Sequence, residues 1–218
     1  MNRNAWPGSC ANDENERTRI NMKIRITLTE DMLGTASQNK NIHEEFIASK
    51  SKDASKQKEE LESLPAEELM EKAVTVFHRD ANGTPILFDY QIKGFIKEAV
   101  GVLLELQGEV KVGKTKLSKF THKRIVDNYV FVTPRQIRLN AVGPICTRPL
   151  RADTMKGERV SLASSETMPA GTVFECEVNT LTPDLEPLMR ACLDYGALKG
   201  IGQWRNSGKG RFSWEEVK

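Results

Sequence analysis

Residues 200–212 read GIGQWRNSGKGRF, a glycine-rich loop between a predicted helix and the last predicted strand. A Gly-x-Gly pair stands near each end of it, and the residues between the pairs are polar, aromatic or charged. Glycine reaches positive φ without strain and lacks the Cβ that would keep a ligand away from the backbone. Successive N–H groups in such a loop can bind an anion.

Cations gather around this loop, with five lysines or arginines and one acid between residues 190 and 211. Trp204 adds a flat face on which a base can stack. The loop therefore favours contact with a nucleic-acid backbone, although a mobile surface turn is the alternative interpretation. The residues expected to make this contact are Lys199, Gly200, Gly202, Trp204, Arg205, Asn206, Ser207, Gly208, Lys209, Gly210 and Arg211.

The glycine spacing does not match two common nucleotide-binding motifs. The dinucleotide fingerprint needs G-x-G-x-x-G after a strand, and the P-loop needs G-x-x-x-x-G-K-[ST]. Lys209 does follow Gly208, but Gly210 stands where the magnesium-binding Ser or Thr is required. Hydrolysis of a nucleoside triphosphate is therefore not expected.

The length and composition predict one large domain, or a small domain with insertions, in a reducing, cytoplasmic setting. The 218 residues carry a net charge of +2, and no apolar run approaches the ~18 residues of a membrane span. The N-terminus lacks the apolar segment of a signal peptide. Cys10, Cys146, Cys176 and Cys192 form no C-x-x-C, so neither a zinc site nor a disulfide framework is indicated. Cys176 and Cys192 are expected to be buried free thiols.

The charge is distributed unevenly along the chain. Residues 111–124 carry six cations and no acid, and residues 135–159 carry six cations and two acids, whereas residues 43–72 are net acidic. A basic second half next to the glycine loop is typical of a phosphate-binding face, although solvated loops are the alternative. Further candidate contacts are Lys93, Lys116, Lys119, Lys123, Arg124, Arg148 and Arg151.

Residues 1–21 are polar and have no periodicity, which predicts a disordered tail, or upstream sequence with Met22 as the true start of translation. Residues 22–218 are expected to form a single domain with insertions at about 30–85, 107–124 and 143–171.

Apolar periodicity predicts the elements of this domain. They are a strand at 23–29, short helices around 42–47 and 65–73, a helix at 90–106 with Asp89 as N-cap, strands at 125–132, 136–141 and 172–180, a helix capped by Thr182, and a strand at 211–217 with Phe212 and Trp214 facing inward. Residues 111–124 are expected to form an excursion or a long hairpin, and residues 148–162 a second basic excursion.

The simplified order is β-α-β-β-α-β, which predicts an α+β, ferredoxin-like (RRM-like) core with long insertions and a C-terminal glycine-rich loop. Sheet faces of this fold often bind RNA. The fold also supports many unrelated functions, so the function must be argued from the site.

Four segments together resemble the RAMP superfamily, the RNA-binding backbone subunits of CRISPR effector complexes. Residues 198–212 are similar to the family's glycine-rich loop, and residues 23–29 with 32–35 to its first strand and turn. Residues 85–97 resemble the turn that enters its first helix, and residues 168–174 the turn before its third strand. Asp89, Tyr90 and Gln91 replace the small residues that the family carries there.

The resemblance implies a module that binds RNA or single-stranded DNA, without a cofactor or metal. Its further partners would be other CRISPR-complex subunits or copies of itself, with no membrane involved. A phage-borne or stand-alone relative that mimics a subunit and inhibits the complex (an anti-CRISPR) is the alternative.

Some relatives of this family are metal-independent endoribonucleases that use a histidine as general acid or base. Among His43, His78 and His122, the last is the strongest candidate because Lys123 and Arg124 follow it as possible phosphate ligands. A solvated histidine in a basic loop is the ordinary alternative.

Other relatives cleave through an aspartate in the loop after the first strand, where Glu30 and Asp31 stand here. No local pattern supports either residue, so we expect binding without catalysis.

Overall fold

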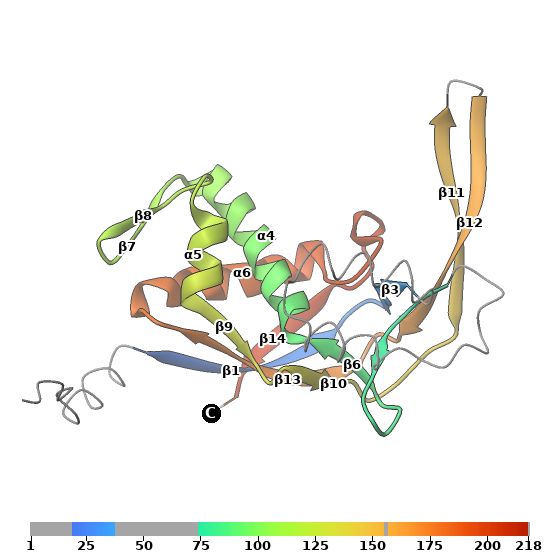
Figure 1. Ribbon diagram of the computed structural model, residues 1–218, viewed down its shortest axis with the longest axis horizontal. Helices are drawn as coiled ribbons and strands as arrows, with labels where there is room; N and C mark the ends of the chain where they lie inside the picture. Colours follow the sequence, from blue (N-terminus) through green and yellow to red (C-terminus); the bar gives the residue numbers. More distant parts are fainter. Residues whose placement is uncertain (1–18, 38–73, 155–156, 218) are drawn as a thin grey trace, which may run out of the picture.

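The computed structural model describes residues 19–37, 74–154 and 157–217 (Figure 1). Its elements are β1 (Ile20–Leu28), β2 (Met32–Leu33), β3 (Ala36–Ser37), β4 (Val74–Val76), β5 (His78–Arg79), β6 (Pro85–Phe88), α4 (Asp89–Gln107), β7 (Val110–Val112), β8 (Thr115–Leu117), α5 (His122–Tyr129), β9 (Val130–Thr133), β10 (Gln136–Arg138), β11 (Ile145–Thr154), β12 (Gly157–Met168), β13 (Val173–Thr180), the 3-10 turns η2 (Pro183–Leu185) and η3 (Arg205–Ser207), α6 (Glu186–Lys199) and β14 (Phe212–Glu216). The helices predicted around 42–47 and 65–73 lie outside the described residues.

The main sheet has four antiparallel strands in the order β14-β1-β13-β9. The alternation that predicted its first strand is confirmed, because Met22, Ile24 and Ile26 are buried and the residues between them are not. The strand begins at Ile20, which pairs with Thr180, so two residues assigned to the N-terminal tail belong to the sheet.

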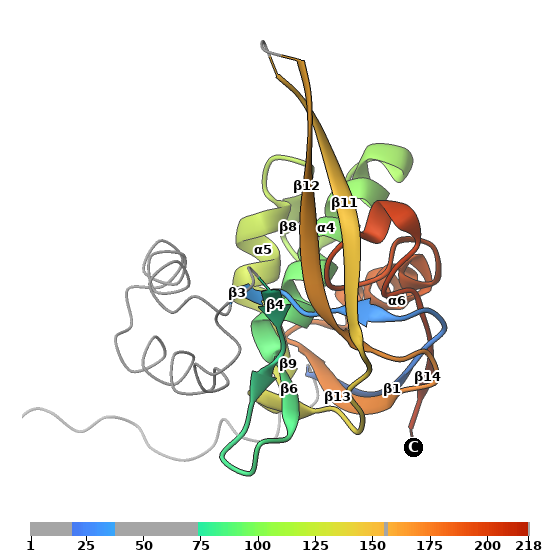
Figure 2. The same cartoon turned by 90° about the vertical axis from the view of Figure 1, so that its right-hand side faces the viewer.

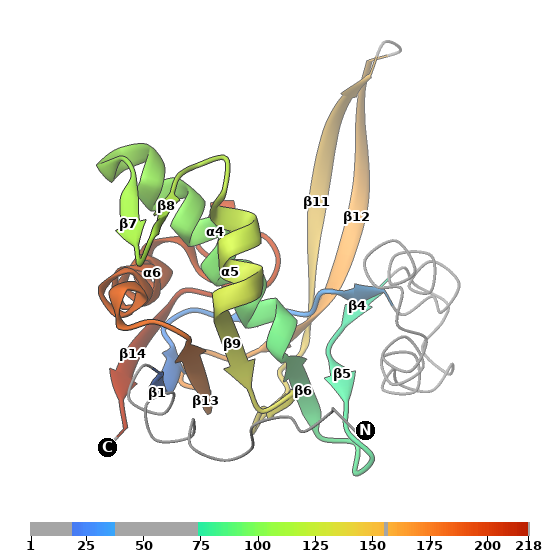
Figure 3. The same ribbon diagram turned by 60° about the vertical axis from the view of Figure 1, so that its left-hand side comes forward.

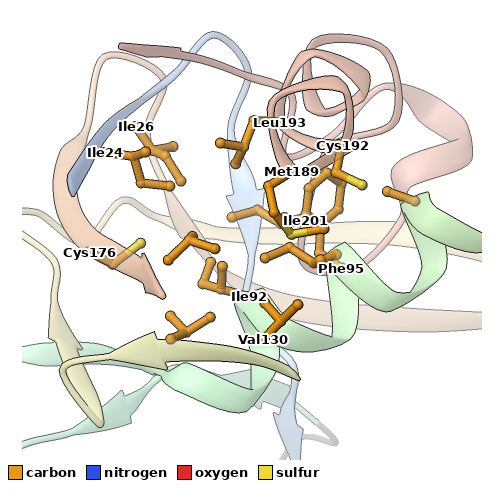
Figure 4. Packing of buried hydrophobic residues seen from close by; sticks show 14 of the residues in the cluster. Ile24, Ile26, Ile92, Phe95, Val130, Cys176, Met189, Cys192, Leu193 and Ile201 are labelled. Carbon is orange, nitrogen blue, oxygen red and sulfur yellow. The ribbon is translucent and has the colours of Figure 1, made fainter. Parts of the chain in front are cut away.

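Helices α4 and α6 cover one face of this sheet and enclose the main core (Figure 4). Ile92 and Phe95 come from α4, and Met189 and Leu193 from α6. Both helices were predicted from their apolar stripes, and both are confirmed.

The predicted N-cap of α4 is wrong by one residue. Phe88 occupies that position, and its N–H donates to Oε1 of Gln91 at 2.8 Å. Asp89 is instead the first helical residue, and its carboxylate accepts a hydrogen bond from Arg135.

The elements that build this layer follow each other as strand, helix, strand, strand, helix, strand: β1, α4, β9, β13, α6 and β14. The α+β class is therefore confirmed. None of the helices in the described part of the chain combines the length and the apolarity needed to cross a bilayer.

The strand predicted at 125–132 is wrong over its first five residues, which belong to α5. Ile125 and Val126 lie one turn from Tyr129 and Val130, so the same apolar residues suit a helix. Both are buried, and α5 packs beside α4 (Figure 3). The basic segment before it forms the short hairpin β7–β8 and the first turn of α5.

The excursion predicted at 148–162 is instead part of a long antiparallel hairpin, β11–β12. Its pairing runs from Ile145 with Glu166 to Thr154 with Gly157, and it projects from the body of the molecule (Figures 1 and 2). The base of the hairpin is anchored by the carboxylate of Glu166, which accepts the N–H of Phe77 at 2.8 Å and pairs with Arg79.

Cys176 and Cys192 are buried free thiols, as predicted. Burial raises the pKa of each to about 12. A thiol with so high a pKa stays protonated at neutral pH and is a poor nucleophile.

A test of the core concerns Gly196 in α6, where an added Cβ would overlap the ring of Phe212. That ring is buried and packs edge-on against Phe95, so it has little room to move. We expect Gly196→Ala to lower the free energy of unfolding by ~1–3 kcal/mol through overpacking. Urea unfolding measures the loss.

Gly94→Ala in α4 is the control, because a Cβ there meets nothing within 4 Å. Since alanine favours a helix over glycine, this variant should be neutral or slightly more stable. Equal stability of Gly196→Ala and the wild type would show that the contact between α6 and β14 is loose.

Candidate nucleic-acid interface

The glycine loop is built by close backbone packing. Gly200, Gly202, Gly208 and Gly210 have φ values of 75°, 83°, 83° and 75°. A Cβ at Gly202 would lie 2.8 Å from the carbonyl oxygen of Leu33, and one at Gly210 would overlap the carbonyl of Ile201. The fold thus requires these glycines, whatever the loop binds.

Residues 202–206 present a run of N–H groups, and none of these donates to an acceptor among the described residues. Gly202 and Trp204 have positive φ values of 83° and 55°, whereas Gln203 between them does not. In an anion-binding nest, right- and left-handed conformations alternate and successive N–H groups face one anion, and positive φ at every second residue is compatible with that arrangement.

Three of the predicted phosphate ligands are paired with acids of the same chain. Nη1 of Arg205 lies 2.6 Å from Oε2 of Glu98, and Nζ of Lys199 lies 3.7 Å from its Oε1. Nζ of Lys209 lies 3.0 Å from Oδ2 of Asp31. Glu98 and Asp31 are 38% and 42% exposed, so solvent and ligands reach both pairs.

The remaining cation of the loop, Arg211, lies on its exposed side. Its Nε donates to the carbonyl oxygen of Leu198 at 3.1 Å. A guanidinium carries five N–H groups in all, so the others can contact a phosphate.

Asp31 joins the loop to two other segments. Its Oδ1 accepts the N–H of Ala170 at 3.1 Å, and its backbone oxygen accepts the N–H of Gly210 at 2.8 Å. The hydrogen bond from Lys209, followed by that from Ala170, lowers the pKa of the Asp31 carboxyl below its usual value. Both carboxylate oxygens of Asp31 therefore accept hydrogen bonds, and we call this set of contacts the Asp31 clamp.

Trp204 contacts the long hairpin through Arg148 of β11. The guanidinium lies 5.0 Å from the ring centroid of Trp204 and donates to Oγ of Ser165 at 3.1 Å and to Oε1 of Gln203 at 3.3 Å. Arg148 is 7% exposed, and its Nε has no acceptor among the described residues. Trp204 is 39% exposed, so its ring remains accessible to a ligand.

The other candidate cations lie apart from the loop. Lys93 of α4 donates to the backbone oxygen of Asp127, and burial lowers its pKa. Lys119 lies over the ring of Phe120. Lys116 of β8 pairs with Glu109, which precedes β7. Lys123 and Arg124 are exposed on α5, and Arg151 lies in β11.

His122 opens α5, and its Nδ1 lies 2.7 Å from the backbone oxygen of Lys119. It borders a shallow hollow on α4, together with Glu98, Glu105 and Lys123. Within the described ranges, no three His, Cys, Asp or Glu side chains gather as a metal site requires.

The face of the main sheet opposite the helices carries more acids than bases. Arg25 pairs with Glu175 at 2.8 Å and with Glu215 at 2.9 Å, and Lys23 pairs with Glu175 at 3.2 Å. Glu177 adds a further acid beside them. This face is less favourable to phosphates than the glycine loop, which makes the loop the better candidate interface.

A cavity of about 270 Å³ opens between α4, β2–β3 and the glycine loop. Its apolar lining includes Leu33, Ile92 and Phe95, and Arg205 belongs to its wall. Sequence patterns missed this cavity, because its wall comes from four segments that are distant along the chain.

No family model matches the sequence, and no curated protein matches it. Among solved structures, the fold is similar to that of a chain in the cryo-EM structure of the type III-B Cmr-beta complex bound to cognate target RNA. The TM-score is 0.49 at 11% identity, over 94% of this chain and 61% of that chain. This chain thus spans less than two thirds of the Cmr-beta chain.

A chain of a type IV-B CRISPR complex is also similar, with a TM-score of 0.46 at 10% identity, over 91% of this chain and 90% of that chain.

The Asp31 clamp predicts a pH dependence of stability. The folded pKa of Asp31 lies below the unfolded value of 3.8, so its contribution is complete above that value and is lost as the pH falls through the folded pKa. We expect Asp31→Asn to lower the thermal midpoint at pH 7, and the gap to the wild type to close as the pH falls below 3.8.

Glu30→Gln is the control, since that neighbouring side chain is exposed. Thermal melts of the three proteins between pH 7 and pH 3 measure the effect. A gap that stays constant over this range would refute the charged clamp.

Proposed function

We propose that this chain is a non-catalytic module that binds single-stranded nucleic acid, RNA in the first place, through its glycine loop. The observation that carries the proposal is the run of N–H groups at residues 202–206, which lack acceptors among the described residues. Arg205, Lys209 and the accessible ring of Trp204 lie in or beside this run. Phosphates suit the N–H groups and the cations, and a base suits the ring.

The proposed core is ferredoxin-like. The spatial order β14-β1-β13-β9, together with the succession of strands and helices along the chain, supports this assignment. The ligand is placed at the loop between α6 and β14, because the sheet face that the helices leave uncovered carries more acids than bases.

Binding would proceed by exchange of ion-pair partners. In the free protein, Arg205 is held by Glu98 and Lys209 by Asp31. Exposed ion pairs contribute only ~0–1 kcal/mol, so exchanging a carboxylate for a phosphate costs little. The acids keep the two cations ordered until a phosphate replaces them.

The proposed setting is a CRISPR effector complex, or a protein that mimics one of its subunits. The support is the resemblance of residues 198–212 to the RAMP glycine loop. Cleavage is not part of the proposal, because both carboxylate oxygens of Asp31 accept hydrogen bonds from the protein itself.

The first test of this function is the salt dependence of single-stranded RNA binding. Filter binding at several salt concentrations should give a log–log slope of about −0.7 for each phosphate that is neutralised. Arg205→Ala should weaken binding to all sequences and make the slope shallower by about one contact.

Lys111→Ala is the control for the loss of one positive charge, since Lys111 is exposed on β7. The absence of RNA binding by the wild type at low salt would refute the function. Retained docking onto a CRISPR complex in that case would identify a protein-interaction module.

A second prediction concerns the acid that competes with the ligand. Glu98→Gln removes the charge that holds Arg205 and Lys199, so we expect tighter RNA binding and a steeper salt slope. Glu105→Gln removes the same charge about two turns further along α4, away from the loop, and should change affinity less. Weaker binding by Glu98→Gln would show that the ion pair belongs to the bound state.

A further inference from the structure

The cavity beside the glycine loop has the features of a site for a flat ligand. Its volume of about 270 Å³ lies just below the range of roughly 300–1,000 Å³ that is common for small-molecule sites. The rings of His78, Tyr90 and Phe95 contribute to its wall. A cavity of this size and lining suits one aromatic ring system and is too small for a chain of several nucleotides.

Two polar side chains of this wall hold each other in a defined orientation. Oε1 of Gln91 accepts the N–H of Phe88 at 2.8 Å, which fixes the amide group. Nε2 of Gln91 then donates to Oγ1 of Thr35 at 2.7 Å. An amide nitrogen carries two N–H groups, and a hydroxyl that accepts a hydrogen bond keeps its own O–H to donate. The pair therefore offers one N–H of Gln91 and the O–H of Thr35 as donors to a ligand.

The cavity adjoins the proposed phosphate site directly. Gly202 and Arg205 belong to the cavity wall, and they also belong to the loop whose N–H groups lack acceptors. A nucleotide with its phosphate on the loop would therefore have its base within reach of the cavity.

We propose that this cavity takes a single unstacked nucleobase, and that it prefers bases with a carbonyl edge, uracil and guanine, over adenine. The inference rests on the proposed function, because it assigns a base site to the same loop. A carbonyl oxygen of uracil or guanine can accept from both donors, Gln91 and Thr35, whereas the acceptors N1 and N7 of adenine flank an amino group that itself donates. An unstacked base is read in this way, by hydrogen bonds to its edge and by contact of its faces with aromatic and apolar side chains.

The test introduces a larger side chain at a position of the cavity wall that tolerates one. Gly94 belongs to the cavity wall, and a Cβ there meets nothing within 4 Å. Gly94→Leu should keep the fold and weaken binding of an oligouridylate about tenfold, the loss of one base contact. Gln107→Leu places the same side chain at the exposed end of α4 and should bind as the wild type does.

The nucleosides uridine and adenosine separate this inference from the proposed function, because they carry no phosphate. Saturation-transfer NMR should detect uridine on the wild type with an affinity about five- to tenfold above that of adenosine. Gly94→Leu should abolish this signal. In Gln91→Glu, the new carboxylate accepts hydrogen bonds where the amide donated one, and the preference should shift toward adenosine.

The outcomes are distinguishable. RNA binding that is unchanged in Gly94→Leu overturns the base site and leaves the proposed function standing. Uridine binding without any RNA binding supports the cavity and refutes the function. Equal affinities for uridine and adenosine, or a preference that does not respond to Gln91→Glu, overturn the assigned recognition by Gln91 and Thr35.

Discussion

The carboxylate of Asp31 holds together the segments that make the candidate site. One oxygen accepts the N–H of Ala170 before β13, and the other binds Lys209 in the glycine loop. The backbone oxygen of the same residue fixes Gly210. Three segments that are distant in sequence thus meet at one residue. The position of the loop over α4, and with it the cavity and the Arg205–Glu98 pair, depends on this junction.

The sequence predicted those strands and helices in which apolar residues recur at a regular spacing. The alternation at Met22–Leu28 and the apolar stripes of α4 and α6 follow directly from burial on one face. The spacing of the apolar residues at 125, 126, 129 and 130 suits both a strand and a helix. Packing against α4 favours the helix for the first three of them. The β11–β12 hairpin was missed because residues 145–168 carry no sustained apolar alternation.

The sequence predicts which residues of the glycine loop are candidate ligands, but not the contacts that these residues make within the chain. The cations of the loop and its glycines are visible in the sequence. Their partners are not, because Glu98 lies 107 residues from Arg205 and Asp31 lies 178 residues from Lys209. The glycine pattern also has a structural cause, since side chains at Gly202 and Gly210 would collide with the backbone. The spacing of the glycines therefore follows from how the loop packs and is not by itself evidence of a ligand.

The long hairpin has a mechanical consequence. At about 3.4 Å per residue, its strands extend roughly 30 Å from a base held by Glu166. A small rotation of the hairpin at its base therefore produces a large displacement of its far end. Arg148 lies near this base and contacts both Trp204 and Gln203. A force on the far end would therefore act at the base, where Arg148 connects the hairpin with the glycine loop.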